Sequence, residues 1–188
     1  MKIFSLSALL MMLISLSAQK DPVIKCIQNK IEGVASIEVL GDEEGFEKVY
    51  DIRLNQPVDH NNPEAGEFQQ RIYLYHKDYK KPVIFVTEGY DIKDRKYELT
   101  DILDANQISV EYRFFGESAP DTLQWEYLTN KQAAEDLHRI RDMFGRIYKE
   151  EWVSTGISKG GTTTMMYKAL YPGDVDASVN YVGPLPLA

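Results

Sequence analysis

The segment of this sequence that most directly indicates chemistry is a serine between glycines at residues 156–160. It reads Gly-Ile-Ser-Lys-Gly and matches the G-x-S-x-G nucleophile elbow, in which the serine occupies a sharp turn from a strand into a helix. Glycine suits the flanking positions because it has no side chain to clash in so tight a turn. The residues before it have the composition of a strand, and those after it have that of a helix. We therefore expect Ser158 to be the nucleophile of an acyl-transfer reaction.

The same turn would supply an oxyanion-binding group. In such an elbow the backbone N–H of the next residue, here Lys159, faces the developing negative charge, assisted by the positive end of the helix. We expect a second N–H from Gly89 or Tyr90, in the loop after the third predicted strand. The alternative is a phosphate-binding loop, but a P-loop requires Gly-Lys-Ser/Thr in that order, whereas this chain has Ser-Lys-Gly-Gly-Thr. The sequence indicates no cofactor and no metal.

The sequence shows no base for this serine. In this fold the partners follow the nucleophile in the order Asp or Glu, then His. The histidines of the chain all precede it, and we interpret each as a solvated or capping residue: they are His60, His76 and His138. Asp174 and Asp176 follow Ser158, but we interpret them as residues of a helix-to-strand loop. We therefore expect the acid and the base to lie beyond Ala188 and this chain alone to be inactive.

The elements that position these residues follow from the hydrophobic pattern. Alternation predicts strands at 46–54 and 68–76, which form an antiparallel hairpin across a turn-rich connection. A continuous apolar run at 82–89, ending in a glycine loop, predicts a strand buried on both faces of a parallel sheet. The remaining predicted elements alternate, namely helix 93–103, strand 107–115, helix 130–148, strand 152–157, helix 162–171 and strand 175–182. This order predicts a mostly parallel sheet with flanking helices, the N-terminal part of an α/β-hydrolase.

The first eighteen residues predict a secretory signal peptide. Lys2 precedes a stretch of apolar and small hydroxyl residues, and small residues end it, so we expect cleavage after Ser17 or Ala18. A membrane anchor is the alternative, but polar residues begin at Gln19, too soon for a span of about 20 apolar residues. We expect a secreted or periplasmic protein with no membrane attachment after cleavage. Residues 19–188 would then be the N-terminal portion of a catalytic domain, without its cap and C-terminal part.

Composition excludes two classes of protein. The 188 residues include 29 acidic and 21 basic ones, scattered rather than clustered, so nucleic acid is not an expected partner. The single cysteine, Cys26, rules out an internal disulfide framework. Because it lies well past the apolar leader, we expect a buried structural thiol rather than a lipid-anchor site.

Four segments together resemble the secreted prolyl tri- and tetrapeptidyl aminopeptidases, relatives of lysosomal Pro-Xaa carboxypeptidase and dipeptidyl peptidase II. They are QPVDHNNPEAGEFQQRIYLYHKD, VTEGYD, EYRFFGESAP and GISKGGTTT, and they span residues 56–164. Lysine after the serine, where the lysosomal relatives have tyrosine, favours the aminopeptidase branch. The resemblance implies an exopeptidase that removes short N-terminal peptides, with a preference for proline before the cut. It also implies a helical cap after the strand at which this chain stops.

An exopeptidase must also bind the terminal ammonium of its substrate, and a carboxylate near the nucleophile is the usual means. We expect Glu88, in the loop on the oxyanion side, to do this, with Glu111 and Glu117 as alternatives. The competing interpretation of Glu111 is a structural one, pairing with an arginine to hold a loop. Two other functions remain open: an esterase or lipase, because fold and elbow do not fix the acyl substrate, and a non-catalytic remnant.

Overall fold

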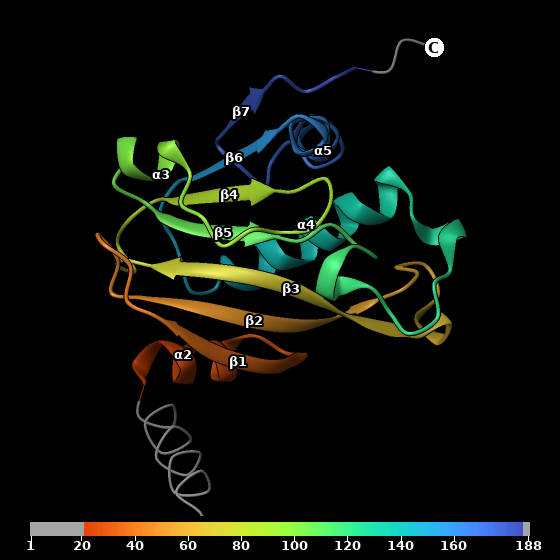
Figure 1. Cartoon of the computed structure of the whole chain (residues 1–188), viewed down its shortest axis with the longest axis horizontal. Coiled ribbons are helices and arrows are strands. Elements are labelled where there is room, and N and C mark those ends of the chain that lie inside the picture. The colour runs from red at the N-terminus through yellow and green to blue at the C-terminus, as the bar shows by residue number, and fades with distance from the viewer. Residues whose placement is uncertain (1–20, 186–188) are drawn as a thin grey trace, which may run out of the picture.

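The computed structural model describes residues 21–185 and forms one mixed β-sheet with helices on both faces (Figure 1). The predicted signal peptide lies outside the described residues. Within them, no helix combines the length and the apolar character that a membrane crossing requires.

The sheet has seven strands in the order β1-β2-β3-β5-β4-β6-β7. Their bounds are β1 Val34–Gly41, β2 Lys48–Pro57, β3 Glu67–His76, β4 Val83–Thr87, β5 Asn106–Val110, β6 Trp152–Ile157 and β7 Ala177–Tyr181. The pairs β1–β2, β2–β3 and β3–β5 are antiparallel, whereas β5–β4, β4–β6 and β6–β7 are parallel. The predicted hairpin is therefore confirmed, and so is the parallel pairing of β5, β4, β6 and β7, although the sheet as a whole is mixed rather than mostly parallel.

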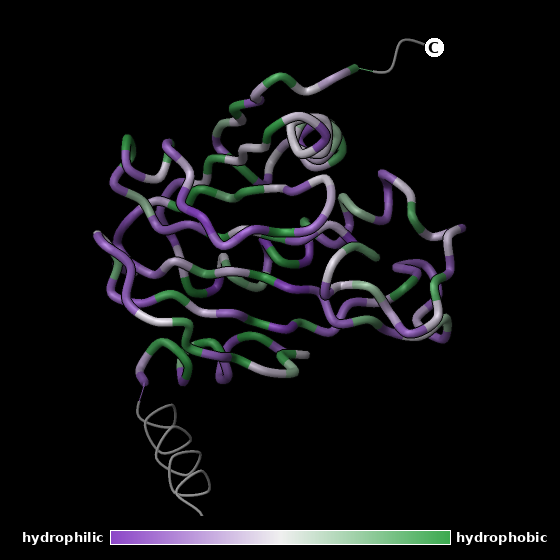
Figure 2. Tube along the Cα trace, in the orientation of Figure 1, coloured by the Kyte–Doolittle hydropathy of each residue, from purple (hydrophilic) through white to green (hydrophobic). Residues whose placement is uncertain are grey.

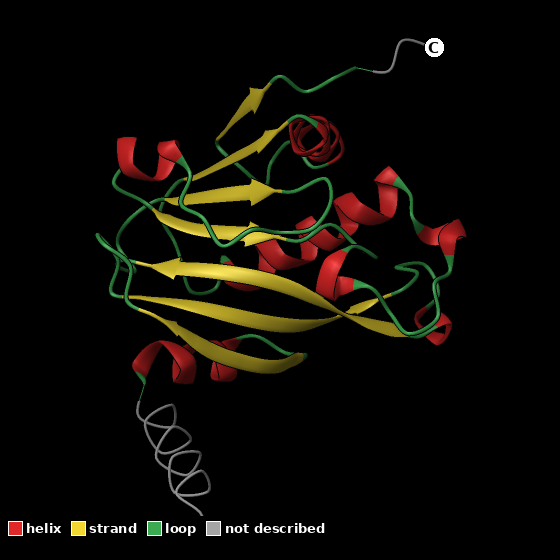
Figure 3. Cartoon of the chain, viewed as in Figure 1, coloured by secondary structure: helices red, strands yellow, loops and turns green. Residues whose placement is uncertain are grey.

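Within residues 21–185, four α-helices flank the sheet (Figure 3). They are α2 Pro22–Lys30, α3 Glu98–Ile102, α4 Asn130–Phe144 and α5 Lys159–Leu170. Successive side chains of a strand point to opposite faces, and β4 shows which helices cover which face. Phe85 belongs to a core cluster shared with α2, α4 and α5. Val86 belongs to a separate cluster with Tyr97 and with Leu99 of α3, so α3 lies on the opposite face.

The centre of the sheet is apolar and fully covered. All five residues of β4 are buried, and the trace of this strand is largely hydrophobic in Figure 2. Helix α4 begins at the N-cap Thr129, whose side chain accepts a hydrogen bond from the Gln132 N–H. The predicted apolar stripe of this segment is buried throughout: it comprises Ala133, Leu137, Ile140, Phe144 and Ile147.

The structure adds two N-terminal elements, α2 and β1, that the sequence pattern did not indicate. Asp21 caps α2 by accepting hydrogen bonds from two N–H groups of its first turn. Strand β1 is mostly exposed and pairs with β2 through two register shifts, so its residues show no clean alternation. Cys26 on α2 is half-buried against the core, not buried as expected.

Several predicted elements are shorter in the structure. The predicted strand 107–115 ends at Val110, because the chain turns there into a loop in which Phe114 has φ 67°. The predicted helix 130–148 ends at Phe144, and the predicted helix 93–103 is reduced to α3. Residues before α3 are not helical because the Gln107 side chain binds the Arg95 carbonyl and the Tyr97 N–H.

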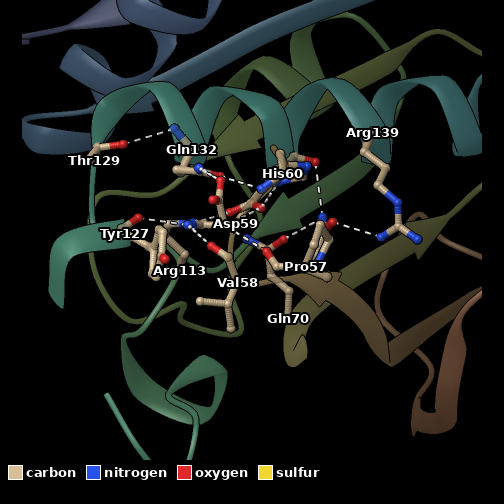
Figure 4. Close-up of polar contacts among 12 residues, drawn as sticks. Pro57, Val58, Asp59, His60, Gln70, Arg113, Tyr127, Thr129, Gln132 and Arg139 are labelled. Carbon is tan, nitrogen blue, oxygen red and sulfur yellow. Dashed lines mark hydrogen bonds and ion pairs between the residues drawn. The ribbon is translucent and has the colours of Figure 1, made fainter. Parts of the chain in front are cut away.

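One buried arginine connects loops at the end of the sheet where the predicted active site lies. Arg113 is fully buried, and its Nε and Nη2 donate to the two carboxylate oxygens of Asp136 on α4 at 2.7 and 2.9 Å. Its remaining N–H groups donate to three backbone carbonyls, which belong to Pro57, Val58 and Tyr127. Figure 4 shows Arg113 directed toward Val58 and Tyr127, beneath the helix that carries Gln132. All five guanidinium donors are thus used, and α4, the loop after β2 and the turn at Tyr127 are fixed to one another.

Candidate active site

Ser158 occupies a strained turn between β6 and α5. Its φ of 55° and ψ of −120° are rare for a residue with a side chain. The Ser158 N–H donates to the Tyr181 carbonyl at 2.9 Å, and its carbonyl accepts from the Thr162 N–H. The side chain is exposed. This is the geometry that the sequence pattern predicts for a nucleophile elbow.

The flanking glycines are required by close backbone contacts. A Cβ added to Gly156 would lie 2.3 Å from the Gly160 carbonyl, and a Cβ on Gly160 would lie 2.5 Å from the Thr87 carbonyl oxygen. Both separations are far shorter than real Cβ contacts, so no other residue type fits without moving the backbone. Thr87 also donates through Oγ1 to the Gly160 carbonyl at 3.0 Å. The end of β4 is therefore packed directly on the first turn of α5.

A cavity of about 190 Å³ opens around Ser158. It is lined by Glu88, Gly89, Tyr90, Asp91, Lys93, Arg95, Ile157, Ser158, Lys159 and Gly160. The structure thus brings together Ser158 and four of the residues predicted for its site, namely Lys159, Gly89, Tyr90 and Glu88. The first N–H groups of a helix have no intrahelical acceptor, so the Lys159 N–H at the start of α5 is available to an oxyanion.

The loop opposite Ser158 is held by two backbone hydrogen bonds and by one from a backbone N–H to a carboxylate. The Glu88 N–H donates to the Val110 carbonyl, and the Tyr112 N–H donates to the Tyr90 carbonyl at 3.1 Å. The Ile92 N–H donates to a carboxylate oxygen of Glu111 at 3.0 Å. These contacts fix the loop to the residues that follow β5, so that Gly89 and Tyr90 face the elbow in one defined arrangement.

Lys159 packs across this loop. A Cβ on Gly89 would lie 2.2 Å from Lys159 Cγ, so the lysine stem rests directly on the glycine. The ammonium lies 4.1 Å from the centroid of the Tyr112 ring, a cation–π contact. Burial lowers the pKa of Lys159. The side chain therefore closes one wall of the cavity, and Gly89 is needed because the lysine occupies the space where its side chain would be.

Glu88 is half-buried at the edge of the cavity. Its Oε1 accepts a hydrogen bond from Tyr97 Oη at 2.5 Å. Burial raises the pKa of Glu88, and the Tyr97 hydrogen bond and the positive charge of Arg95 oppose this rise. A carboxylate in this position can pair with a cation that enters the cavity beside Ser158.

The other two predicted carboxylates lie elsewhere. Glu111 is buried and uses both oxygens within the fold, one on the Ile92 N–H and the other on the N–H and hydroxyl of Ser118. It does hold a loop, through backbone and serine donors rather than through an arginine. Glu117 is exposed, lies 3.7 Å from Arg53 in an ion pair, and lines a different surface hollow.

None of the three histidines in the described part of the chain lines the cavity around Ser158. His60 Nε2 lies 2.7 Å from Asp136 Oδ1, which also binds Arg113. His76 is 1% exposed and contacts the Tyr148 hydroxyl, so the expectation of a solvated or capping residue is wrong for it. Burial of this imidazole lowers its pKa.

His138 and the two aspartates form part of the α5–β7 connection. The His138 ring is stacked on Tyr171, and its Nδ1 lies 2.7 Å from Asp174 Oδ2. Asp176 Oδ2 accepts a hydrogen bond from the Trp152 N–H at 2.8 Å. Both aspartates are loop residues, as predicted.

Two residues near Glu88 had no sequence signal: Arg95 lines the cavity around Ser158, and Tyr97 lines the neighbouring cavity. Arg95 and Tyr97 fall inside a segment predicted as helix, where neither would be singled out. The extended backbone before α3 brings both to Glu88. Within the described residues, no group of histidine, cysteine and carboxylate side chains is arranged to hold a metal ion.

Comparison with known proteins identifies a family and individual relatives that match this chain. The PS-10 peptidase S37 family matches residues 20–187. Prolyl tri/tetrapeptidyl aminopeptidase of Streptomyces mobaraensis is 44% identical over 135 residues, which cover 71% of this chain and 28% of that protein. Serine protease vicPb of Bipolaris victoriae is 31% identical over 146 residues, which cover 63% of this chain and 27% of that protein. The resemblance expected from the sequence motifs is therefore confirmed, and the chain spans less than a third of either relative.

Solved structures confirm the fold class. Acetyl xylan esterase 1 from Thermoanaerobacterium sp. JW/SL YS485 aligns with a TM-score of 0.53 at 13% identity, over 84% of this chain and 56% of that chain. At this identity the match shows the fold alone. The predicted α/β-hydrolase architecture is therefore correct.

Proposed function

This chain belongs to the PS-10 peptidase S37 family, and on that basis we propose that it is the N-terminal portion of a longer serine exopeptidase. The complete protein would release tri- or tetrapeptides from the free N-terminus of peptides, with a preference for cleavage after proline. The identity to the Streptomyces mobaraensis enzyme supports this substrate class.

In the proposed mechanism, Ser158 Oγ attacks the carbonyl carbon of the scissile bond while a general base removes its proton. The tetrahedral oxyanion is stabilised by the N–H of Lys159 and by that of Gly89 or Tyr90. Collapse breaks the C–N bond, and the departing amine takes the proton from the protonated base. The acyl-enzyme ester at Ser158 is then hydrolysed by water, which regenerates the serine and releases the short peptide.

The base would come from the rest of the complete protein. In the described part of the chain His60, His76 and His138 are engaged by Asp136, Tyr148 and Asp174, and none lines the cavity. We therefore expect residues 1–188 alone to have no triad-dependent turnover. Activity of this chain that disappears on Ser158→Ala would contradict the assignment.

Glu88 would bind the terminal ammonium of the substrate. It faces the same cavity as Ser158, and its carboxylate is the one predicted for this role that lies there. A charge-assisted hydrogen bond between carboxylate and ammonium would fix the position of the substrate N-terminus. It would thereby set the number of residues between the N-terminus and the cleaved bond. Glu117 does not serve here because it lines another hollow.

The observation that best supports a nucleophilic role is the backbone of Ser158. A φ of 55° at a residue with a side chain is costly, and here it presents the hydroxyl at the mouth of a cavity with the first N–H of a helix beside it. A purely structural serine gains nothing from this arrangement.

The test compares the complete protein with its Ser158→Ala variant on tripeptidyl substrates ending in proline, either free or N-acetylated. We expect the complete protein to turn over the free form and to turn over the acetylated form only slightly. The Ser158→Ala variant should turn over neither. Equal turnover of both forms would contradict the exopeptidase proposal. Turnover of esters without turnover of peptides would identify an esterase instead. Absence of both, with no labelling of Ser158 by a fluorophosphonate, would indicate a non-catalytic protein.

We also propose that the protein is exported. The support is the charged start, the apolar run and the small-residue end of residues 1–18. N-terminal sequencing of protein from its native cells should begin at residue 18 or 19. A cytoplasmic protein that begins at Met1 would contradict export.

A further inference from the structure

Glu88 is the end of a hydrogen-bonded chain of three side chains. Arg95 Nη2 donates to Tyr97 Oη at 2.6 Å, and Tyr97 Oη donates to Glu88 Oε1 at 2.5 Å. The Arg95 guanidinium also lies 4.6 Å from the centroid of the Tyr97 ring. We call these residues, Arg95, Tyr97 and Glu88, the relay. It runs from a cation through a phenol to a carboxylate, at the edge of the cavity around Ser158.

Hydrogen bonds with Gln107 anchor the backbone of Arg95 and Tyr97 to the sheet. This residue of β5 is fully buried, and its Nε2 donates to the Arg95 carbonyl at 2.9 Å. Its Oε1 accepts hydrogen bonds from the Tyr97 N–H and the Thr100 hydroxyl, both at 2.8 Å. Tyr97 is itself 7% exposed and packs in the core cluster beside α3. The phenol therefore reaches Glu88 from a buried residue whose backbone is anchored by Gln107.

The relay occupies one oxygen of Glu88 only. Among the described residues, Oε1 receives the Tyr97 hydroxyl, and no donor is found for Oε2. Because the carboxylate accepts through both oxygens, Oε2 stays available to a ligand in the cavity.

We propose that Tyr97 and Arg95 are positioning residues for substrate binding, which fix the Glu88 side chain and favour its ionised form so that Oε2 meets the terminal ammonium. This rests on the function proposed above for Glu88. Neither residue touches the reacting atoms. Their effect is confined to substrates that carry a free N-terminus.

The electrostatic consequence has a definite sign. The charged and titratable groups that face Glu88 are Tyr97, Arg95, Asp91, Lys93 and Lys159. Burial raises the pKa of Glu88, Asp91 raises it as well, and the Tyr97 hydrogen bond and the charges of Arg95 and Lys93 lower it. Without the Tyr97 hydroxyl the pKa of Glu88 rises further. The carboxyl group then stays neutral up to a higher pH, and a neutral carboxyl group cannot pair with an ammonium ion.

The test measures binding in the complete protein carrying Ser158→Ala, so that no turnover occurs. The ligands are the peptide amide Ala-Ala-Pro-NH2 and its N-acetyl form, titrated by calorimetry from pH 5 to pH 8. Tyr97→Phe should weaken binding of the free amine at least about tenfold near the lower pH values, the lower end of what one hydrogen bond to a charged group contributes. The pH below which free-amine affinity is lost should move upward. Binding of the acetylated peptide should not change.

Two matched controls lie on the same side of the sheet. Tyr181 Oη donates to Glu98 Oε1 at 2.7 Å, the same pair of groups beside a neighbouring cavity of about 310 Å³. Lys96 Nζ lies 3.0 Å from Asp101, next to Arg95 in the chain but outside the relay. Tyr181→Phe and Lys96→Gln should leave the ratio of free to acetylated affinity unchanged. Arg95→Gln should lower the ratio of free to acetylated affinity, as Tyr97→Phe does.

The outcomes separate this inference from the proposed function. If Glu88→Gln lowers the ratio and Tyr97→Phe does not, the relay is overturned and the role of Glu88 stands. If Tyr97→Phe weakens both peptides equally, Tyr97 has a general structural role and the inference is wrong. If Glu88→Gln leaves the ratio unchanged, both the assignment of Glu88 and the relay fail, while the turnover comparison still decides whether the protein is a peptidase.

Discussion

Replacing Arg113 by methionine should destabilise the protein more than any other single removal of a positive charge in the described chain. Methionine fills a similar volume but donates no hydrogen bond. The substitution would leave the Asp136 carboxylate buried, with the His60 ring nitrogen at 2.7 Å as its remaining side-chain contact. Three carbonyl groups, those of Pro57, Val58 and Tyr127, would also lose their donor.

The expected size follows from this inventory. Removing one partner of a buried ion pair costs about 3 to 5 kcal/mol, because the other charge remains without compensation. A natural domain has only about 5 to 15 kcal/mol of unfolding free energy. We therefore expect Arg113→Met to remove a large fraction of the stability. Adding Asp136→Leu should recover part of the loss by removing the uncompensated charge, but not all of it, since the three carbonyls stay without the guanidinium.

Urea unfolding of the complete protein, followed by circular dichroism, measures these differences. Arg146→Met is the control, because Arg146 forms an exposed ion pair with Asp142 at 2.7 Å and such pairs contribute less than about 1 kcal/mol. If Arg113→Met changes the free energy of unfolding no more than Arg146→Met does, the fully bonded guanidinium does not stabilise the fold. A double variant as stable as the wild type would show that the carbonyl contacts contribute nothing.

Three further results are expected. Gly160→Ala should reduce labelling by a fluorophosphonate at least about tenfold, because its Cβ meets the Thr87 carbonyl at 2.5 Å, whereas Gly173→Ala, with nothing within 4 Å, should label normally. Ser158→Ala should abolish labelling and leave the melting temperature equal to or above that of the wild type, since alanine removes no described side-chain contact. Burial lowers the pKa of His76 below 6.5, so the unfolded chain binds the extra proton, and the stability present above about pH 6.5 is lost as the pH falls. In urea titrations, His76→Leu should therefore lose less stability than the wild type between pH 7 and pH 5. An unchanged pH dependence would contradict this.

The sequence predicted the elbow and the strands around it because local chemistry determines both. Ser158 lies where three signals coincide: a strand pattern, a glycine spacing and a helical segment. The buried strand β4 is predicted correctly because its apolar run is continuous, and α4 because its stripe has a clear helical period.

The rest depends on contacts between distant residues. The segment before α3 has an ordinary helical composition, but the side chain of Gln107 on the next strand binds the backbone of Arg95 and Tyr97 in an extended arrangement. Strand β1 is exposed and shifted in register, so its sequence shows no alternation. The three carboxylates predicted to bind the ammonium look alike in sequence: they are Glu88, Glu111 and Glu117. Their difference comes from which backbone N–H groups and cavities the fold places beside them.

The strained turn at Ser158 also bears on the order in which the protein folds. The close contacts around this turn join the Thr87 carbonyl at the end of β4 to Gly156 and Gly160, and β4 pairs with β6 through partners as far apart in the chain as Val83 and Trp152. Contacts between such distant residues close late, because loop closure costs entropy before the contact is gained. Until then nothing holds the serine in its costly conformation. We therefore expect a nascent or partly unfolded chain to carry an ordinary, unreactive serine. The rate at which Ser158 of the complete protein becomes reactive toward a phosphonate should then report the closing of the sheet.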